Sequence, residues 1–372
     1  MVVKLWERMT LLNINTASMD KKTKIILIIV ILLALVFAFS IKMMGSETIR
    51  IDNGAEESGT AEDVQPEEQA AAEPEGIRSR LNGSVCANPE QRPIAVMLGG
   101  DAEARPLSGL IEADVVIEMP VVTSSITRYM AIFGCNKTAE IGSVRSARHD
   151  FIPLALGFDA ILAHWGGSHF ALDKLNSGIM DNINALYLDG STFYRKKNKL
   201  APFNGFTSFA LMEKYATQRG YRLTNNFSGY KFLEEEDPAV TKGRLTIGYP
   251  SSFRVEYQYD PVKNEYLRFK GGMRELDGNT NTQVAAKDVV IMYAASRQIE
   301  GQYNDVDIEG EGNAIIYRNG TETKGRWSKD KGVMASKLLF FDENGQEIAF
   351  VPGQIWIQVV QPGQSVDWTA GL

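Results

Sequence analysis

Cysteine and histidine are both scarce in this sequence, which contains two cysteines and three histidines in 372 residues. No histidine lies near Cys86 or Cys135 along the chain, so a cysteine nucleophile activated by a neighbouring histidine is not expected. The histidines His149, His164 and His169 fall within 21 residues, but their spacing matches no metal-binding motif. An internal repeat and a glycine-rich phosphate loop are also missing. The sequence therefore predicts no metal site and no cofactor.

A strong excess of positive charge is missing as well. The net charge is −7, and residues 46–77, with ten acidic residues and one arginine, contribute more than all of it. The chain from Arg78 onward is close to neutral, so it offers no basic surface of the kind that nucleic-acid binding requires. A nucleic-acid partner is therefore not expected, and protein partners stay open.

One long apolar run is present near the N-terminus. Residues 25–41, IILIIVILLALVFAFSI, carry no charge, with three lysines just before them and one after. The run is short for a membrane span, but flanking lysines can snorkel to lengthen it. Because more lysines precede the run than follow it, we expect a cytoplasmic N-terminus (1–24), a single transmembrane anchor (25–44) and an extracytoplasmic remainder.

Two other forms of export are weighed against this anchor. A cleaved signal peptide is the main alternative, although the run is longer than a typical signal core and no clear cleavage site follows it. A lipid anchor is less favoured because the first cysteine is Cys86. The sequence from Met19 resembles an export signal and residues 1–18 do not, so Met19 is the expected start. An oxidising compartment would allow a disulfide between Cys86 and Cys135, and two buried thiols are the equal alternative.

Composition and patterning divide the rest of the chain into regions. Residues 45–83 are acidic and poor in aromatics, which predicts a disordered linker. In residues 84–228 the apolar runs RPIAVML, DVVIEMPV, SITRYMAIFGC and FDAILAHW predict strands. Helices are expected at 146–156, at 170–177 and from Thr207 or Ser208 to Gly220. This alternation predicts a mixed α/β layer domain.

The C-terminal region has a different pattern. Residues 229–362 contain alternating apolar positions, a DPVKN turn and two Asn-Gly pairs between apolar runs. Asn-Gly is a strong hairpin signal, so a mainly antiparallel β domain is expected, followed by a tail at 363–372. The predicted fold class is α+β, with the transmembrane helix preceding both domains.

The segment IGSVRSARHDF holds two arginines close together. If a helix begins at Ser146, Arg145 and Arg148 lie in its first turn, where cations oppose the helix dipole by about 0.3–1 kcal/mol each. An anion would resolve this conflict. It is either a carboxylate or phosphate of a ligand, or a carboxylate of the chain itself, for which the candidates are Asp114, Glu118 and Asp150.

Two carboxylates and one histidine are candidate catalytic residues. Glu118 lies in the apolar run VVIEMPVV, so it needs a partner or has a raised pKa. A general acid for glycosidic cleavage has a raised pKa, and Asp189 would be its second carboxylate. The favoured interpretation pairs Glu118 with Arg128 or Arg145 instead. His164 ends a buried strand and opens a Gly-Gly loop, where either a reactive role or a simple hydrogen bond is expected.

Several of these motifs together are similar to a known family. ARPLSGLIEADVVIEMPV, IGSVRSARHDFIPLA, FDAILAHWGGS, LDGSTFYR and APFNGFTS resemble, in order, the N-terminal domain of the YerB-like lipoproteins of Gram-positive bacteria. DVVIMY, KGRWSK and PGQIWIQVV resemble the C-terminal domain of that family. The resemblance covers about residues 90–362 and implies an envelope-anchored two-domain protein of unknown activity. Members commonly have a histidine where this chain has Phe203, and a lipidated cysteine that this chain lacks.

The resemblance also implies a shared cleft. The residues at matching motif positions are Arg128, Arg145, Arg148, His164, Asp189, Arg195 and Asn204.

These observations predict a binding protein more than an enzyme. Arg145, Arg148 and Arg195 would contact a cell-wall glycan, muropeptide or teichoic-acid segment, with Asp189 and Asn204 orienting it. Trp165 or Phe193 would pack on sugar faces. The alternatives are a cell-wall hydrolase or lytic transglycosylase that uses Glu118 or Asp189, and a structural scaffold of an envelope complex.

Overall fold

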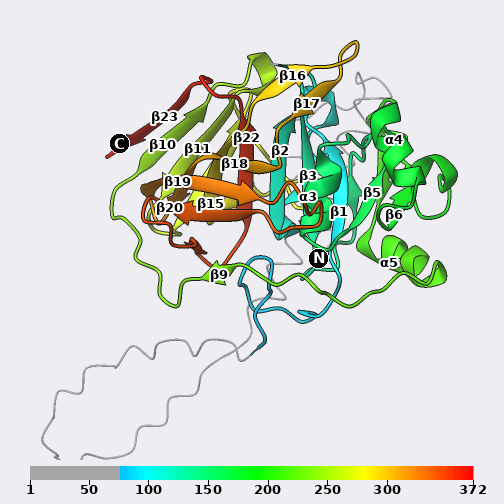
Figure 1. The fold of residues 1–372 in the computed structure, drawn as a ribbon, viewed down its shortest axis with the longest axis horizontal. Coiled ribbons are helices and arrows are strands. Elements are labelled where there is room, and N and C mark those ends of the chain that lie inside the picture. The colour runs from blue at the N-terminus through cyan, green and yellow to red at the C-terminus, as the bar shows by residue number, and fades with distance from the viewer. Residues whose placement is uncertain (1–75, 124, 372) are drawn as a thin grey trace, which may run out of the picture. The chain divides into compact units, whose positions relative to one another are not determined.

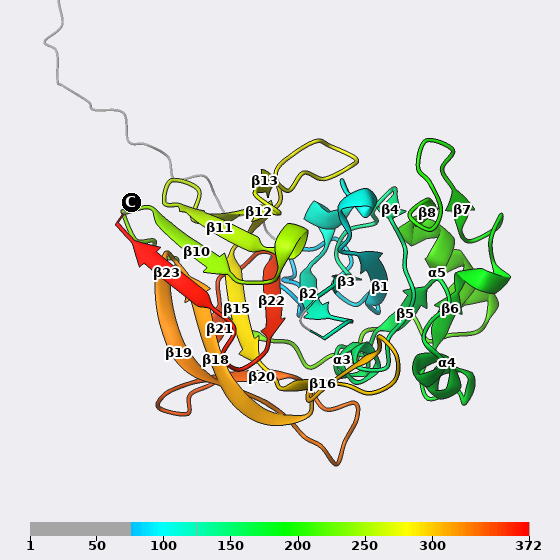
Figure 2. The same ribbon diagram turned by 90° about the horizontal axis from the view of Figure 1, so that it is seen from above.

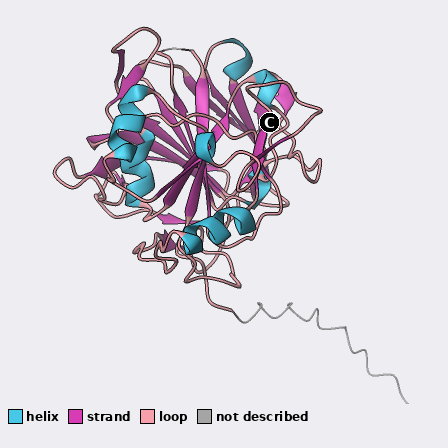
Figure 3. Ribbon diagram, turned by 90° about the vertical axis from the view of Figure 1, so that its right-hand side faces the viewer, coloured by secondary structure: helices cyan, strands magenta, loops and turns pink. Residues whose placement is uncertain are grey.

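The computed structural model describes residues 76–123 and 125–371. The predicted cytoplasmic N-terminus, the predicted anchor and most of the predicted linker lie outside these residues. Among the helices of the described part, none has the length and apolar character needed to cross a membrane. Among the described elements, β-strands predominate over a few short helices (Figure 3), so the mainly β character predicted for residues 229–362 is confirmed.

One ten-stranded sheet forms the largest assembly of strands in the described residues (Figure 1). Its order is β20-β19-β18-β15-β22-β2-β3-β1-β5-β6. In chain order these strands are β1 (Ile94–Gly99), β2 (Val115–Pro120), β3 (Thr127–Phe133), β5 (Ile161–His164), β6 (Asn182–Asn184), β15 (Asp288–Tyr293), β18 (Gly310–Arg318), β19 (Thr321–Lys329), β20 (Leu339–Asp342) and β22 (Ile355–Val360). Strand β22 runs parallel to both β15 and β2, so the sheet continues through both predicted regions.

Two cores lie on opposite faces of this sheet, because successive side chains of a strand alternate between its faces. In β1, Met97 belongs to one core, and Val96 and Leu98 belong to the other. Helix α3 (Phe151–Gly157) packs in the first core, and α5 (Phe209–Gln218) packs in the second. Burial on both faces explains why the central strands read as continuous apolar runs.

A second, six-stranded sheet also packs in the second core. It contains β10 (Gly243–Ile247), β11 (Val255–Asp260), β12 (Glu265–Lys270), β13 (Met273–Arg274), β14 (Ala285–Ala286) and β23 (Val366–Ala370). Three small sheets complete the described strands: β16 (Ser296–Gln298) with β17 (Asn304–Val306), β9 (Lys231–Phe232) with β21 (Ala349–Phe350), and β4 (Ile141–Gly142) with β8 (Gly205–Thr207) and β7 (Tyr194–Arg195).

The α-helices gather beside β5 and β6, as Figure 2 shows. Helix α4 (His169–Asn176) confirms the helix predicted at 170–177. Helix α5 begins after Ser208, whose side chain accepts a hydrogen bond from the Leu211 N–H at 3.2 Å. Gly220 follows it in the left-handed region, at φ 71°. The predicted N-cap and C′ residues of this helix are therefore confirmed.

The helix predicted to begin at Ser146 begins at Phe151 instead. Residues before it are held extended by backbone bonds to other parts of the chain. Val144 bridges to Leu98, and the Ala147 N–H donates to the Gly166 carbonyl at 2.9 Å. The helix-dipole conflict predicted for the two arginines therefore does not arise, and their setting has a different physical basis.

The hairpins predicted at the DPVKN turn and at the first Asn-Gly pair are confirmed, whereas the second pair, Asn344 and Gly345, lies within a single antiparallel bridge between Phe341 and Glu347. Strands β11 and β12 pair antiparallel around the DPVKN turn. Strands β18 and β19 pair around Asn319 and Gly320, which have φ angles of 51° and 71°. Two consecutive positive φ angles define the type I′ turn that Asn-Gly favours.

The chain is folded further at both ends than predicted. Leu81, inside the predicted linker, is buried, and the Asn82 amide donates to Asp114 at 2.7 Å. Strand β23, inside the predicted tail, pairs along its length with β10, and Trp368 packs against the second core. The folded region therefore extends beyond the boundaries that composition predicts, because apolar side chains in the predicted linker and in the predicted tail pack against the rest of the fold.

Cys86 and Cys135 form a disulfide across 49 positions of sequence. Of the two alternatives predicted for these residues, the bonded one is therefore present. The bond ties the segment before β1 to the residues that follow β3.

Candidate functional site

Loops that follow β1 and β5 meet at one edge of the large sheet, because these strands are parallel neighbours. Strand β3 runs antiparallel to β1, so Arg128 at its start lies opposite Gly99 at the end of β1. The carboxyl edge of parallel strands is where α/β folds place their ligands. Three predicted site residues, Arg128, Arg145 and Arg148, gather at this edge, and we call them the arginine cluster.

The extended segment 143–148 is fixed between the two loops by backbone bonds. The Arg145 N–H donates to the Met97 carbonyl at 2.8 Å, and the Trp165 N–H donates to the Arg145 carbonyl at 2.9 Å. Gly99 allows this close approach, since a Cβ there would lie 3.1 Å from the Arg145 Cγ. The backbone therefore fixes the positions of Arg145 and Arg148 before any side-chain contact is made.

Arg128 is the most buried member of the cluster, at 4% exposure. One guanidinium nitrogen, Nη1, donates to the Ser146 carbonyl at 2.7 Å, while the buried Nε–H has no partner in the described protein. Burial, together with Arg148 and Arg145, lowers the pKa of Arg128 well below its usual range, and Asp101 opposes this. Since arginine keeps its proton in proteins, the lowered pKa means that the surroundings disfavour a cation.

Arg145 and Arg148 have similar surroundings. Each donates from Nη1 to a backbone carbonyl, Arg145 to Pro202 at 3.1 Å and Arg148 to Ala147 at 3.0 Å. Each also lies over an aromatic ring, Phe203 at 4.8 Å and Tyr303 at 5.5 Å respectively. Their Nε–H groups are buried without a partner in the described protein. Burial is the largest cause that lowers the pKa of both side chains.

No arginine of the cluster forms an ion pair with a carboxylate anywhere in the described residues. Asp101 attracts Arg128 and Arg145 from a greater distance, and one of its own carboxylate oxygens is buried without a partner. Asp150 attracts Arg148 in the same way, so the three cations have two carboxylates nearby but no ion pair, and they repel one another. Backbone carbonyls and aromatic rings supply partial negative charge, but they do not neutralise the cluster.

The internal partners predicted for these arginines are engaged elsewhere. Asp114 accepts hydrogen bonds from Asn82 and from the backbone N–H groups of Gly134 and Cys135. Asp150 lies 3.2 Å from the His149 Nε2. Neither of them, nor Glu118, forms an ion pair with Arg145 or Arg148 in the described residues, so the predicted internal partners are wrong, although Asp150 attracts Arg148 from a greater distance.

Glu118 is fully buried and pairs with two cations of β12, Arg268 and Lys270. Burial raises its pKa, but Lys270 and Arg268 outweigh that effect and hold the pKa below its ordinary value. The predicted pairing with Arg128 or Arg145 is therefore wrong in its partners. A general acid needs a raised pKa and contact with its substrate, and Glu118 has neither.

Asp189, Arg195 and Asn204 form a second, exposed group. The Arg195 Nε lies 2.7 Å from the Asp189 carboxylate, and its Nη1 donates to the Asn204 side chain at 3.0 Å. The guanidinium lies 4.2 Å above the Trp165 ring. Arg195 therefore already has a carboxylate partner, unlike the arginine cluster. Asp189 is likewise neutralised by an arginine.

The loop 201–204 connects the two groups, because Arg145 donates to Pro202 and Arg195 to Asn204. The fold therefore brings six of the seven predicted cleft residues, the three of each group, into one neighbourhood through this loop and its contacts. Trp165 is partly buried between them, whereas Phe193 is fully buried against it, with ring centres 5.9 Å apart. Phe193 thus presents no face to a sugar.

His164 lies beneath this neighbourhood and has no exposed surface. Its Nδ1 is 2.7 Å from the Gly166 carbonyl, and its Nε2 is 3.3 Å from the Asn182 side chain. Burial lowers its pKa and so disfavours the charged form of the ring. These contacts match the predicted strand-end histidine held by a hydrogen bond, and they leave it no access to a substrate.

Three residues of the neighbourhood went unnoticed in the sequence: Asp101, Phe203 as a ring beneath Arg145, and Tyr303 beneath Arg148. Tyr303 comes from the loop between β16 and β17, more than 150 positions away from Arg148 in the sequence. No local pattern could have identified it. The Gly-Gly pair before Asp101, at the end of an apolar strand, was the one available signal.

Proteins of similar sequence and structure are known. Residues 82–222 match the family model described as "Protein of unknown function (DUF3048) N-terminal domain", and residues 245–357 match the corresponding C-terminal domain. The Bacillus subtilis (strain 168) protein named "Putative lipoprotein YerB" is 34% identical over 276 residues, which cover 73% of this chain and 82% of that protein. The crystal structure of the YerB protein from Bacillus subtilis matches with a TM-score of 0.72 and 31% identity, over 79% of this chain and 99% of that one.

Proposed function

Since this chain belongs to the DUF3048 family, whose function is unknown, we propose that it is a membrane-associated extracytoplasmic protein that binds an anionic envelope component at the arginine cluster. The family was expected from the sequence motifs, and the comparisons confirm it. They supply no activity, so the proposal stands on the chemistry of the site.

The location outside the cytoplasm has three supports. The similar Bacillus subtilis protein carries the word lipoprotein in its name. The apolar run at 25–41, with its flanking lysines, fits a membrane anchor. The disulfide between Cys86 and Cys135 fits an oxidising compartment, because cytoplasmic thiols are normally kept reduced.

One observation carries the binding proposal: three partly or fully buried arginines share a site without an ion-pair partner in the described protein. Removing a cation from water costs several kcal/mol, and arginine cannot avoid this cost by losing its proton. Proteins normally offset it with a carboxylate. The unpartnered Nε–H groups of Arg128, Arg145 and Arg148 are donors that a phosphate or carboxylate oxygen would accept.

The surrounding residues favour a polymer segment over a small free anion. Arg195 lies over the Trp165 ring, and the loop 201–204 reaches both arginine groups. A polymer with one anionic group bound at the arginine cluster could therefore extend along this loop. Wall teichoic acid supplies phosphodiesters, and peptidoglycan stems supply carboxylates.

Binding of the full detergent-solubilised chain to isolated cell walls tests the proposal. Walls with intact teichoic acid are compared with walls from which it has been extracted, so the two anion sources are distinguished. We expect the doubly substituted Arg145→Gln and Arg148→Gln variant to bind at least tenfold more weakly. Arg326→Gln on strand β19, toward the other end of the large sheet, removes an exposed cation that already pairs with Glu311 at 3.3 Å; it is the matched control and should bind within about threefold of wild type. Unchanged binding of the double variant would exclude the proposed site.

A further inference from the structure

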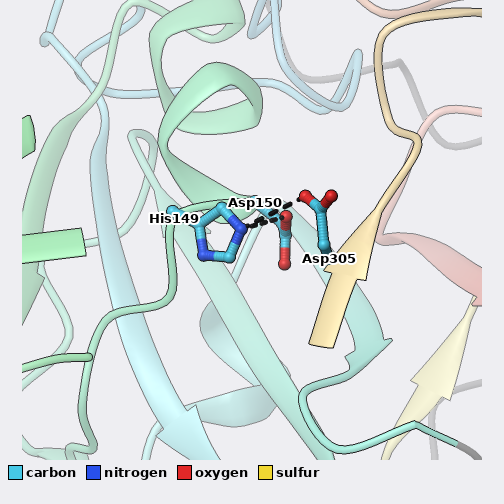
Figure 4. A group of neighbouring side chains, drawn as sticks. All are labelled: His149, Asp150 and Asp305. Carbon is cyan, nitrogen blue, oxygen red and sulfur yellow. Dashed lines mark hydrogen bonds and ion pairs between the residues drawn. The ribbon is translucent and has the colours of Figure 1, made fainter. Parts of the chain in front are cut away.

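His149, Asp150 and Asp305 form a group that the arginine-cluster proposal does not use (Figure 4). His149 and Asp150 immediately precede helix α3, and Asp305 lies in strand β17. The His149 Nε2 lies 3.2 Å from the Asp150 Oδ1 and 3.3 Å from the Asp305 Oδ1. Figure 4 shows both carboxylates on the Nε2 side of the ring. Donor atoms of all three residues lie within 4.8 Å of one another.

Contacts within the described protein leave part of the hydrogen-bonding capacity of these three side chains unused. A neutral imidazole carries a single N–H, so Nε2 can donate to only one carboxylate at full strength. The second imidazole nitrogen, Nδ1, is buried and has no partner in the described protein. If the proton is on Nδ1, the Nε2 lone pair faces two carboxylates. That arrangement is unfavourable unless a cation lies between them.

The spacing of the three donors suits a metal ion. Around a tetrahedral ion with bonds of about 2.0–2.1 Å, ligand atoms lie about 3.3–3.4 Å apart. The two separations from the His149 Nε2, 3.2 and 3.3 Å, agree with this value, and the third, between the two carboxylate oxygens, is within 4.8 Å. The two carboxylates would also balance the charge of a divalent cation.

The group opens into a cavity of about 280 Å³, which gives an ion a path from solvent and leaves room for water as a fourth ligand. Arg297 binds Asp305 through Oδ2, the oxygen that does not face His149, so it orients the carboxylate without occupying the position between the donors. The Val306 N–H donates to the Asp150 Oδ1 at 3.3 Å, the same oxygen that faces His149, so it holds this carboxylate through the proposed ligand atom itself.

We propose that His149, Asp150 and Asp305 bind a divalent transition-metal ion, with Zn²⁺ as the best match. One imidazole nitrogen and two carboxylate oxygens are ligands that zinc takes in tetrahedral sites with an open position. Calcium requires six to eight oxygen ligands, which three side chains do not supply. A bound ion would join the segment before α3 to β17, next to Tyr303, and this inference is independent of anion binding.

The full chain, purified without a histidine tag and stripped with a chelator, tests this site. Isothermal titration with Zn²⁺ should show one ion per chain, and Co²⁺ should give the visible absorption bands of a tetrahedral site. We expect His149→Ala and Asp305→Asn each to weaken Zn²⁺ binding at least tenfold. His169→Ala is the matched control, because His169 forms an exposed pair with Glu300 at 3.2 Å.

Each outcome bears on the proposal. Absence of both Zn²⁺ binding and Co²⁺ bands in the wild-type chain would overturn it without reference to any variant. Zn²⁺ binding that survives both His149→Ala and Asp305→Asn, or that is lost in His169→Ala, would place the ion elsewhere and overturn it too. Tighter binding of Ca²⁺ than of Zn²⁺ would contradict the proposed ligand chemistry.

Discussion

Replacing Arg148 with glutamine removes one charge from the arginine cluster, and its effect on stability can be estimated from the contacts of this residue. Arg148 takes part in two of the three repulsions within the cluster, those with Arg128 and Arg145. Like charges at partly buried positions repel by about 1–2 kcal/mol per pair. Attraction to Asp150 offsets part of this repulsion.

The substitution also removes favourable contacts. The lost interaction with the Tyr303 ring is worth about 0.5–1 kcal/mol, and the lost hydrogen bond to the Ala147 carbonyl about 1 kcal/mol. Relief of repulsion and loss of contacts nearly cancel. We therefore expect the free energy of unfolding of Arg148→Gln to stay within about 1 kcal/mol of wild type. Removing one partner of a buried ion pair would instead cost about 3–5 kcal/mol.

Urea unfolding of the full chain, with and without inorganic phosphate at matched ionic strength, measures both parts of this prediction. Phosphate at a hundred times its dissociation constant should stabilise the wild-type chain by about 2.7 kcal/mol. Most of that gain should be absent from Arg148→Gln. A loss of 3 kcal/mol or more without phosphate would mean that Arg148 has an internal counter-anion. An undiminished gain from phosphate would mean that the anion binds elsewhere, and either result refutes the reasoning.

Three further predictions concern stability. Glu118→Gln should lower the free energy of unfolding by about 3–5 kcal/mol, because it leaves two buried cations without their carboxylate; a loss below about 1 kcal/mol in urea unfolding would contradict the buried ion pairs. Reduction of the Cys86–Cys135 disulfide, which closes a loop across 49 positions, should cost about 4 kcal/mol, and an unchanged urea midpoint in dithiothreitol would argue against this value. Burial raises the pKa of Asp114 from 3.8 to about 6, so its contribution to stability is fully present below pH 3.8 and is lost as pH rises to 6. This contribution, about 3 kcal/mol, should disappear from the pH profile of Asp114→Asn, and parallel profiles of the two proteins would show that Asp114 has an ordinary pKa.

Local signals in the sequence predicted local structure well. The turn at Asn319 and Gly320 needs only two residues that accept positive φ, and the helix after Ser208 needs only a side-chain oxygen at its N-cap. Apolar runs likewise identified β1 and β2 as buried strands. Each of these features depends on residues that are adjacent in sequence, so a pattern of neighbours is sufficient.

Strand pairing depends on distant residues and left no such signal. The insertion of β22 between β15 and β2, parallel to both, is not encoded in any neighbouring pattern. The same limit hid the partners of Glu118. A buried carboxylate in an apolar strand requires a cation, and the sequence supports that requirement. Which cation meets it depends on how the second sheet packs on the first, and that packing selects Arg268 and Lys270.

The arginine cluster was predictable in part from neighbouring residues, and in part it depends on residues that are distant in the sequence. Its residues were identified by type, since closely spaced arginines need anions whatever the backbone does. The reason first assigned to them, a helix N-terminus, fails because Leu98 and Gly167 bridge to the segment and keep it extended. Because the segment is extended, Arg145 and Arg148 do not lie in the first turn of a helix. The unfavourable interaction at this site is therefore the repulsion among the three arginines, and not the repulsion between an arginine and a helix dipole. The repulsion among the arginines is the larger effect, because helix-dipole effects are about 0.3–1 kcal/mol whereas each buried like-charge pair costs about 1–2 kcal/mol. The fold thus increases the electrostatic cost that an anion at this site would relieve.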